Sequence, residues 1–313
     1  MSLLAKLLDA RDPLRLYGTT PPREGSLPEV VETAAARLIE RVKRLPLDGF
    51  VVYDIQDESR RTAVPRPFRF TRTVDPRAYA DLLSSKTGTP AIAYKCVGDM
   101  SEAVWRAWLD ETARDYAIGH LAIVGRPTSR GAGYPLSLTD AIRIAAEDER
   151  RFTVGGVTIA ERHGQQSSES RRMIDKASHG ASFFVSQTVY HAEATVRMLA
   201  DYVRDCAQAG VAPRRVLLTF APVGREKTLA FMKWLGISIA PETERAIQSA
   251  ASPLAKSIEI CRANLARILD QDYVGRVPLG INVESVSINK DEIDASVDLF
   301  HSLLEVLESR LPR

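Results

Sequence analysis

Carboxylate side chains follow several short apolar segments of the chain. Asp54 and Glu58 come after the apolar run at 49–53, and Glu284 ends the run that begins at Pro278. A charged side chain seldom ends a buried strand without a partner or a ligand, so these carboxylates are candidates for proton transfer. A second interpretation stays open, in which each carboxylate pairs with an arginine of the same or a neighbouring loop.

Amide, aromatic and hydroxyl side chains occupy similar places. Gln187 ends an apolar segment and is followed by Tyr190, while Phe220 ends another segment and would form an apolar wall. Glutamine both donates and accepts hydrogen bonds, which suits a heterocycle such as a pterin or flavin ring. Thr19 precedes Thr20 and two prolines, so it either belongs to a small polar floor or to a rigid turn.

Two further segments carry polar groups. The stretch 125–133 is rich in glycine, hydroxyl groups and arginine, including Arg126, and predicts either an anion-binding loop or a plain surface loop. It lacks both the P-loop and the dinucleotide-binding patterns. Glu161 and His163 project to the same side of an extended segment, where they would contact a polar ligand or form a salt bridge. No third ligand stands at metal spacing, so we expect no metal site.

The elements that position these residues alternate regularly. Short β-branched and apolar runs are each followed by a stretch of helical period. The predicted strands are 14–19, 49–54, 90–96, 120–125, 153–159, 181–187, 215–220 and 278–284. The predicted helices are 30–42, 101–117, 137–150, 168–179, 193–209, 226–235, 242–270 and 291–311. This pattern predicts an α/β fold, a single (βα)8 barrel over residues 1–313, with an open doubly wound sheet as the alternative.

Composition and net charge argue against several classes of protein. The 313 residues carry 42 Lys and Arg against 40 Asp and Glu, a net charge of +2, which argues against nucleic-acid binding through bulk charge. Three widely separated cysteines predict reduced thiols, and no segment resembles a signal peptide or a membrane span. We therefore expect a cytoplasmic globular protein with a small-molecule partner, and the sequence leaves homo-oligomerisation open.

The order of these segments resembles the methylenetetrahydrofolate reductases. That family's first-strand pattern of aromatic-Glu-Phe-Phe-Pro-Pro is similar to 17–22, and its Pro-Glu-x-His is similar to 160–163. Its Lys-x-x-x-Gly-Ala-x-x-x-x-Thr-Gln run is matched with full spacing by 176–187, and the acid seven residues earlier is Glu169.

The resemblance implies a (βα)8 barrel that uses FAD and NAD(P)H on a tetrahydrofolate substrate. It implies that Glu161, His163, Glu169 and Lys176 contact the FAD ribose, adenosine and phosphates. It also implies that Gln187 hydrogen-bonds the folate pterin.

Two positions depart from the family pattern. The family's catalytic glutamate, which protonates N5 of the folate, falls on Gly18, and the aspartate near the flavin falls on Arg126. A guanidinium in place of a carboxylate reverses the local field. We therefore expect that Glu284, Asp54 or Glu58 replaces the missing acid.

The resulting hypothesis is a reductase-like enzyme. It would reduce 5,10-methylenetetrahydrofolate to 5-methyltetrahydrofolate with NAD(P)H, with or without FAD as a relay. The alternatives are a tetrahydrofolate-dependent methyl transfer or demethylation protein, and a non-catalytic folate-binding subunit of the same fold.

Overall fold

Eight parallel strands close into a barrel in the computed structural model, which describes residues 2–9, 12–58, 62–125, 135–164 and 168–310. The strands pair in chain order, and the last closes on the first through the register Tyr17 to Val283. They are β1 (Leu14–Thr19), β2 (Gly49–Val52), β3 (Ala91–Cys96), β4 (His120–Val124), β5 (Thr153–Thr158), β6 (Phe183–Thr188), β7 (Arg215–Phe220) and β8 (Leu279–Val283). The predicted (βα)8 barrel is therefore confirmed, and the open sheet is excluded.

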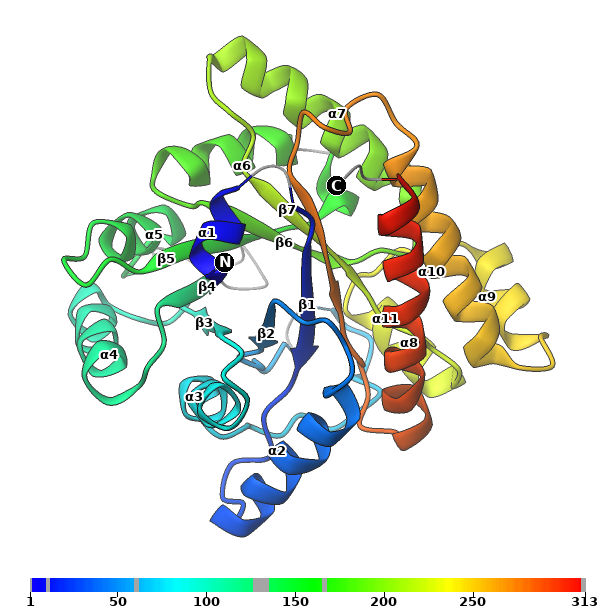
Figure 1. The fold of residues 1–313 in the computed structure, drawn as a ribbon, viewed down its shortest axis with the longest axis horizontal. Helices are drawn as coiled ribbons and strands as arrows, with labels where there is room; N and C mark the ends of the chain where they lie inside the picture. Colours follow the sequence, from blue (N-terminus) through cyan, green and yellow to red (C-terminus); the bar gives the residue numbers. More distant parts are fainter. Residues whose placement is uncertain (1, 10–11, 59–61, 126–134, 165–167, 311–313) are drawn as a thin grey trace.

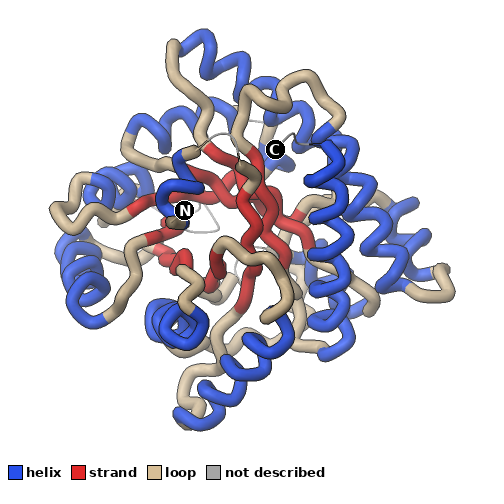
Figure 2. The backbone as a smooth tube through the Cα atoms, in the orientation of Figure 1, coloured by secondary structure: helices blue, strands red, loops and turns tan. Residues whose placement is uncertain are grey.

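Helices surround the strands, as Figures 1 and 2 show. They are α1 (Leu3–Leu8), α2 (Pro28–Val42), α3 (Pro76–Thr87), α4 (Glu102–Asp115), α5 (Leu138–Ala146), α6 (Glu169–Ser178), α7 (Ala192–Ala209), α8 (Glu226–Trp234), α9 (Pro241–Gln248), α10 (Pro253–Leu269) and α11 (Lys290–Arg310). A single 3₁₀ turn, η1 (Ala160–Arg162), follows β5. No helix in the described ranges is long and apolar enough to cross a membrane.

The helix predictions need three corrections, the first being that α1 was not among the predicted helices. The sequence analysis omitted α3, although Asp75 caps its first turn, Pro76 opens it and Gly88 ends it with φ of 69°. The predicted helix 242–270 is two helices, α9 and α10, because Pro253 has no backbone N–H to continue a helix and instead begins the second one.

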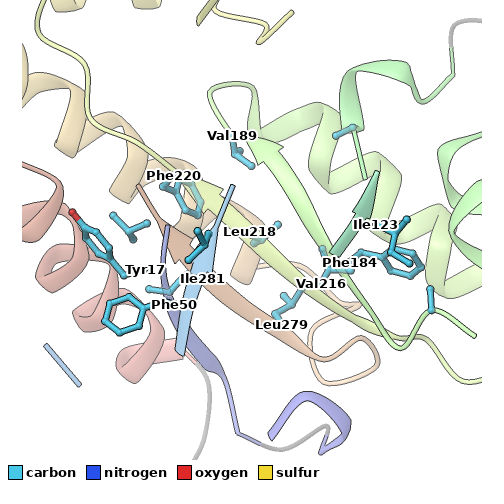
Figure 3. Packing of buried hydrophobic residues seen from close by; sticks show 14 of the residues in the cluster. Tyr17, Phe50, Ile123, Phe184, Val189, Val216, Leu218, Phe220, Leu279 and Ile281 are labelled. Carbon is cyan, nitrogen blue, oxygen red and sulfur yellow. The ribbon is translucent and has the colours of Figure 1, made fainter. Parts of the chain in front are cut away.

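Alternation along each strand divides the apolar residues into two sets. One set fills the barrel, where Leu16, Val51 and Phe183 meet Leu3 and Leu7 of α1. The other set faces outward and packs against the helices, and Figure 3 shows part of it around Phe184 and Leu218. Because α1 covers the end where the strands begin, the opposite end is left for polar side chains (Figure 1).

Candidate functional site

A cavity of about 390 Å³ opens where the strands end. Residues at the ends of all eight strands line it, so it lies at the face that carries the active sites of (βα)8 barrels. Its volume falls within the range of ~300–1,000 Å³ that is usual for small-molecule sites. The lining includes Asp54, Glu58, Gln187 and Glu284, so the structure brings these four sequence-predicted residues together.

A hydrogen-bonded acid group forms the floor of this cavity. Glu284 follows β8 and accepts a hydrogen bond from Thr188 Oγ1 at 3.2 Å. Its second polar neighbour is Tyr53, whose hydroxyl bonds the carboxylate and accepts from Asn282 Nδ2 at 2.7 Å. Burial raises the pKa of Glu284 above its ordinary value, while the bonds from Tyr53 and Thr188 act in the opposite direction. The site therefore holds a carboxyl group that stays protonated at higher pH than an exposed glutamate does.

Gly18 makes room for this acid group. A Cβ atom at Gly18 would lie 3.0 Å from Glu284 Cβ and 3.0 Å from both Cε2 and the hydroxyl oxygen of Tyr53. Contacts this short are tighter than almost all Cβ contacts in folded proteins, so the positions of the Tyr53 phenol and of Glu284 depend on the absence of a side chain at Gly18. The space beside the first strand, where the reductase pattern has a glutamate, is thus occupied from two other strands.

Gln187 owes its position to an irregularity between β6 and β7. The pairing register shifts between Val185 and Thr188, so that Gln187 and Thr188 both reach the cavity although they are consecutive. The hydroxyl of Ser186 maintains this bulge, because it accepts from the backbone N–H of Thr219 at 2.9 Å and donates to the carbonyl of Gln187 at 2.8 Å.

The amide nitrogen of Gln187 has a hydrogen-bond partner within the described part of the chain, whereas the amide oxygen has none. Its Nε2 donates to the carbonyl of Leu235 at 2.9 Å. Its Oε1 is buried and has no hydrogen-bond partner within the described part of the chain. A buried carbonyl without a donor is costly, so this atom is suited to accept a hydrogen bond from a ligand.

The two carboxylates after β2 differ in their surroundings. Asp54 Oδ2 accepts from the backbone N–H of Cys96 at 2.9 Å and lies 3.7 Å from Lys95 Nζ. Asp54 therefore ties β2 to β3 as well as lining the cavity. Glu58 lines the cavity farther from the strand ends, on the segment that leads toward α3.

Three expected ligand contacts lie elsewhere. Phe220 is fully buried among the outward-facing core residues, as its place in Figure 3 shows, and Tyr190 is buried with its hydroxyl on the carbonyl of Ala221. Thr19 does not line the cavity. Contrary to the prediction, none of the three lines this cavity. Thr19 and Phe220 point away because successive strand residues point to opposite faces, and Tyr190 lies beyond the end of β6.

Residues next to Thr19 and Phe220 line the cavity in their place. Thr20 and Thr219 line the cavity, each one residue away from a predicted contact. Tyr53 and Tyr94 line it as well, and burial raises the pKa of both phenols. Sequence reasoning missed these four, although counting inward positions from the apolar residues Leu217 and Val51 would have found Thr219 and Tyr53.

Most of the side chains predicted to contact FAD form hydrogen bonds or ion pairs with other groups of the protein. His163 Nε2 lies 2.8 Å from Asp201 Oδ2. Glu169 is 1% exposed and accepts from the backbone N–H of Ile159 at 3.2 Å. Lys176 lines the cavity with part of its side chain, but its Nζ donates to the carbonyl of Val157 at 2.6 Å and lies 3.9 Å from Glu169.

These contacts brace the end of β5, although Nδ1 of His163 and Oε2 of Glu169 are buried without a hydrogen-bond partner in the described part of the chain. Glu161 is half-buried, its Oε1 lies 3.5 Å from the backbone nitrogen of Ser238, and burial raises its pKa. Arg126 lies outside the described residues. No cluster of three or more potential metal ligands occurs among the residues whose placement is described.

The comparisons with known proteins add one decisive match. An uncharacterized protein from Clostridium thermocellum, which binds two copies of 5-methyl-5,6,7,8-tetrahydrofolic acid, has a similar structure with a TM-score of 0.81. The two sequences are 31% identical, over 97% of this chain and 99% of the other. This chain belongs to the same family. Family membership thus rests on nearly the full length of both proteins.

Other comparisons are weaker. No protein-family model matches the chain, and no curated protein matches it. A 2,3-dimethylmalate lyase of the PEP mutase/isocitrate lyase superfamily has 16% identity over 83% of this chain and 95% of its own, with a TM-score of 0.45. That similarity is too low to support an argument about fold or site.

Proposed function

We propose that this protein binds a reduced folate in the cavity at the ends of the strands and reduces 5,10-methylenetetrahydrofolate to 5-methyltetrahydrofolate with NAD(P)H. Folate binding by the Clostridium thermocellum relative supports the substrate class. The observation that carries the reaction is the placement of Glu284 and Tyr53 in the space next to Gly18. An acid is thereby present where the reductase pattern requires one, although the first strand does not supply it.

Gln187 would orient the folate. Since its Nε2 is held by Leu235, its unpartnered carbonyl oxygen is the atom that would accept from a ligand. The amino and ring N–H groups of a pterin are donors, so they complement that oxygen. A pterin held in this way would lie above the acid group, because Thr188 follows Gln187 directly and contacts Glu284.

Glu284 would act as the general acid. The reaction adds a hydride to the methylene carbon, breaks one carbon–nitrogen bond and takes up one proton on the folate. A carboxyl group whose pKa is raised by burial holds that proton to a higher pH than an exposed glutamate does, and general acid catalysis contributes about 100- to 10,000-fold to a rate. Tyr53 would keep the carboxyl group in position.

Direct transfer from NAD(P)H is the favoured route. Three of the four side chains that the reductase pattern assigns to FAD already bond to groups of the protein, and Glu169 is enclosed. The visible absorption spectrum of the purified protein, before and after addition of FAD, tests this point. A bound flavin that bleaches with NADH would contradict the direct route.

The activity is tested by following 5-methyltetrahydrofolate formation by chromatography, with NADH or NADPH. Glu284→Gln keeps the size of the side chain but removes its proton, so we expect turnover to fall about 100- to 10,000-fold. Turnover of the wild type should be constant at low pH and decline as the pH rises through the raised pKa of Glu284. The exposed carboxylate variant Glu308→Gln serves as the control and should retain activity.

A second function is favoured by one observation. The relative binds a methylated folate, which is the product of the reductase reaction and a substrate for methyl transfer or demethylation. A protein that gains thermal stability from 5-methyltetrahydrofolate but oxidises no NAD(P)H would support that alternative or a non-catalytic folate-binding role.

A further inference from the structure

The segment between β2 and α3 is fastened onto α8 by an aromatic cluster. Trp234 Nε1 donates to the carbonyl of Val64 at 2.9 Å, and the rings of Phe68 and Phe231 meet edge to face at 5.2 Å. Lys227 Nζ lies 4.8 Å from the centre of the Phe68 ring. These contacts hold the β2–α3 segment against α8 at the rim of the cavity, although the two are far apart in sequence.

Arg66 lies inside this cluster, between aromatic rings and near the charges of Glu58 and Asp57. Its guanidinium carbon is 5.3 Å from the Phe70 ring, 5.1 Å from that of Phe231 and 5.2 Å from that of Trp234. Its Nε and Nη1 are buried and have no hydrogen-bond partner in the described chain. Burial lowers the pKa of Arg66, while the charges of Glu58 and Asp57 raise it. Aromatic faces attract the cation but accept no conventional hydrogen bonds from its edge.

The guanidinium also borders the cavity that contains Gln187 and Glu284. A continuous wall connects the two ends, because Gln187 bonds the carbonyl of Leu235 at the end of α8 and Arg66 lies over Phe231 in the same helix. Phe231, Leu235 and Ile237 make this part of the wall apolar. The cavity therefore runs from a polar floor, along an apolar side, to a cation at the rim.

We infer that Arg66 binds the carboxylates of the glutamyl tail of a folate whose pterin is held by Gln187. The inference rests on the proposed function and adds the residue that recognises the tail. A reduced folate has the same order of groups as the cavity: a polar pterin, an aromatic linker and an anionic end. A carboxylate at the rim would accept charge-assisted hydrogen bonds from the unpartnered Nε and Nη1 of Arg66.

A purely structural role for Arg66 makes a different prediction. In that case the guanidinium only holds the β2–α3 segment against α8, and its loss would weaken every ligand in the same proportion. The two roles are therefore separated by ligands that differ in the glutamyl group alone.

The experiment measures affinities by isothermal titration calorimetry for 5-methyltetrahydrofolate and for 5-methyltetrahydropteroate, which lacks the glutamate. We expect the wild type to bind the folate about ten- to 100-fold more tightly, as one or two charge-assisted bonds predict. Arg66→Gln should lose this preference and keep the affinity for the pteroate. The control is Arg69→Gln, which removes an exposed arginine from the same segment and should leave both affinities unchanged.

Two outcomes would overturn the inference. Equal affinity of the wild type for both ligands would show that the tail is not recognised, and this result needs no variant to fold. An equal loss of both affinities in Arg66→Gln would show a structural role only. In both cases folate binding itself persists, whereas failure of the wild type to bind either ligand would contradict the proposed function.

Discussion

Gly18 and Glu284 lie side by side at the ends of two neighbouring strands. β1 and β8 are hydrogen-bonded neighbours with Tyr17 opposite Val283, so the next residues along each strand, Gly18 and Glu284, are adjacent. A carboxylate that leaves the first strand can be replaced from the eighth without changing the fold. The space beside Gly18 is therefore occupied by Tyr53 and Glu284.

A methyl group at Gly18 should disturb this arrangement. In Gly18→Ala the new Cβ would displace Tyr53 or Glu284, because its contacts would be 3.0 Å. We expect a loss of about 1–3 kcal/mol in the free energy of unfolding, measured by urea denaturation, together with weaker folate binding.

The control for this variant is Gly119→Ala, since no atom lies within 4 Å of a Cβ at Gly119. It should change neither property. If Gly18→Ala proves as stable as the wild type and binds folate equally well, the space beside Gly18 does not position the acid group.

At the scale of the elements, β6 shows how a strand end can present consecutive residues to a ligand. Regular alternation would turn either Gln187 or Thr188 away from the cavity. The bulge after Val185 allows both to line it, and the side chain of Ser186 replaces the interrupted backbone pairing. One hydroxyl thus couples the amide of Gln187 to Thr188, which bonds Glu284.

Removal of that hydroxyl should weaken binding more than it weakens the fold. Ser186→Ala leaves the buried N–H of Thr219 without its acceptor, which costs roughly 1–3 kcal/mol. We expect the affinity for 5-methyltetrahydrofolate to fall about tenfold or more in calorimetry, because Gln187 loses its fixed position. Ser178→Ala, on the exposed end of α6, is the matched control, and an equal effect of both variants would contradict this account.

The sequence predicted the barrel and part of the site, for physical reasons that also explain the errors. Periodicity identifies strands well, and polar residues at strand ends correctly indicated Gln187 and Glu284 as cavity residues. The same reasoning misplaced Thr19 and Phe220, because an error of one residue reverses the face of a strand. The contribution of Arg66 could not be predicted, since its aromatic neighbours come from both the β2–α3 segment and α8.

At the scale of the whole molecule, the two ends of the barrel differ in the side chains that they carry. Where the strands begin, α1 inserts Leu3 and Leu7 among the inward-facing apolar residues. Arg215 reinforces this end, with one nitrogen donating to the carbonyl of Leu279 at 2.6 Å and another to the carbonyl of Asp9. Burial lowers the pKa of Arg215 to about 10. Arg215 Nε has no partner in the described part of the chain, and the opposite end carries unpartnered polar atoms of Gln187 and Arg66 beside the cavity, where a ligand could bond them.

The most direct test of the central claim is the affinity for 5-methyltetrahydrofolate, measured by calorimetry on the wild type, Gln187→Ala and the exposed-surface control Gln208→Ala. We expect the wild type and Gln208→Ala to bind equally. Gln187→Ala should bind about tenfold or more weakly, because the ligand loses its acceptor in the cavity. Absence of binding by the wild type, or unchanged affinity in Gln187→Ala, would contradict the assignment of this cavity as a folate site.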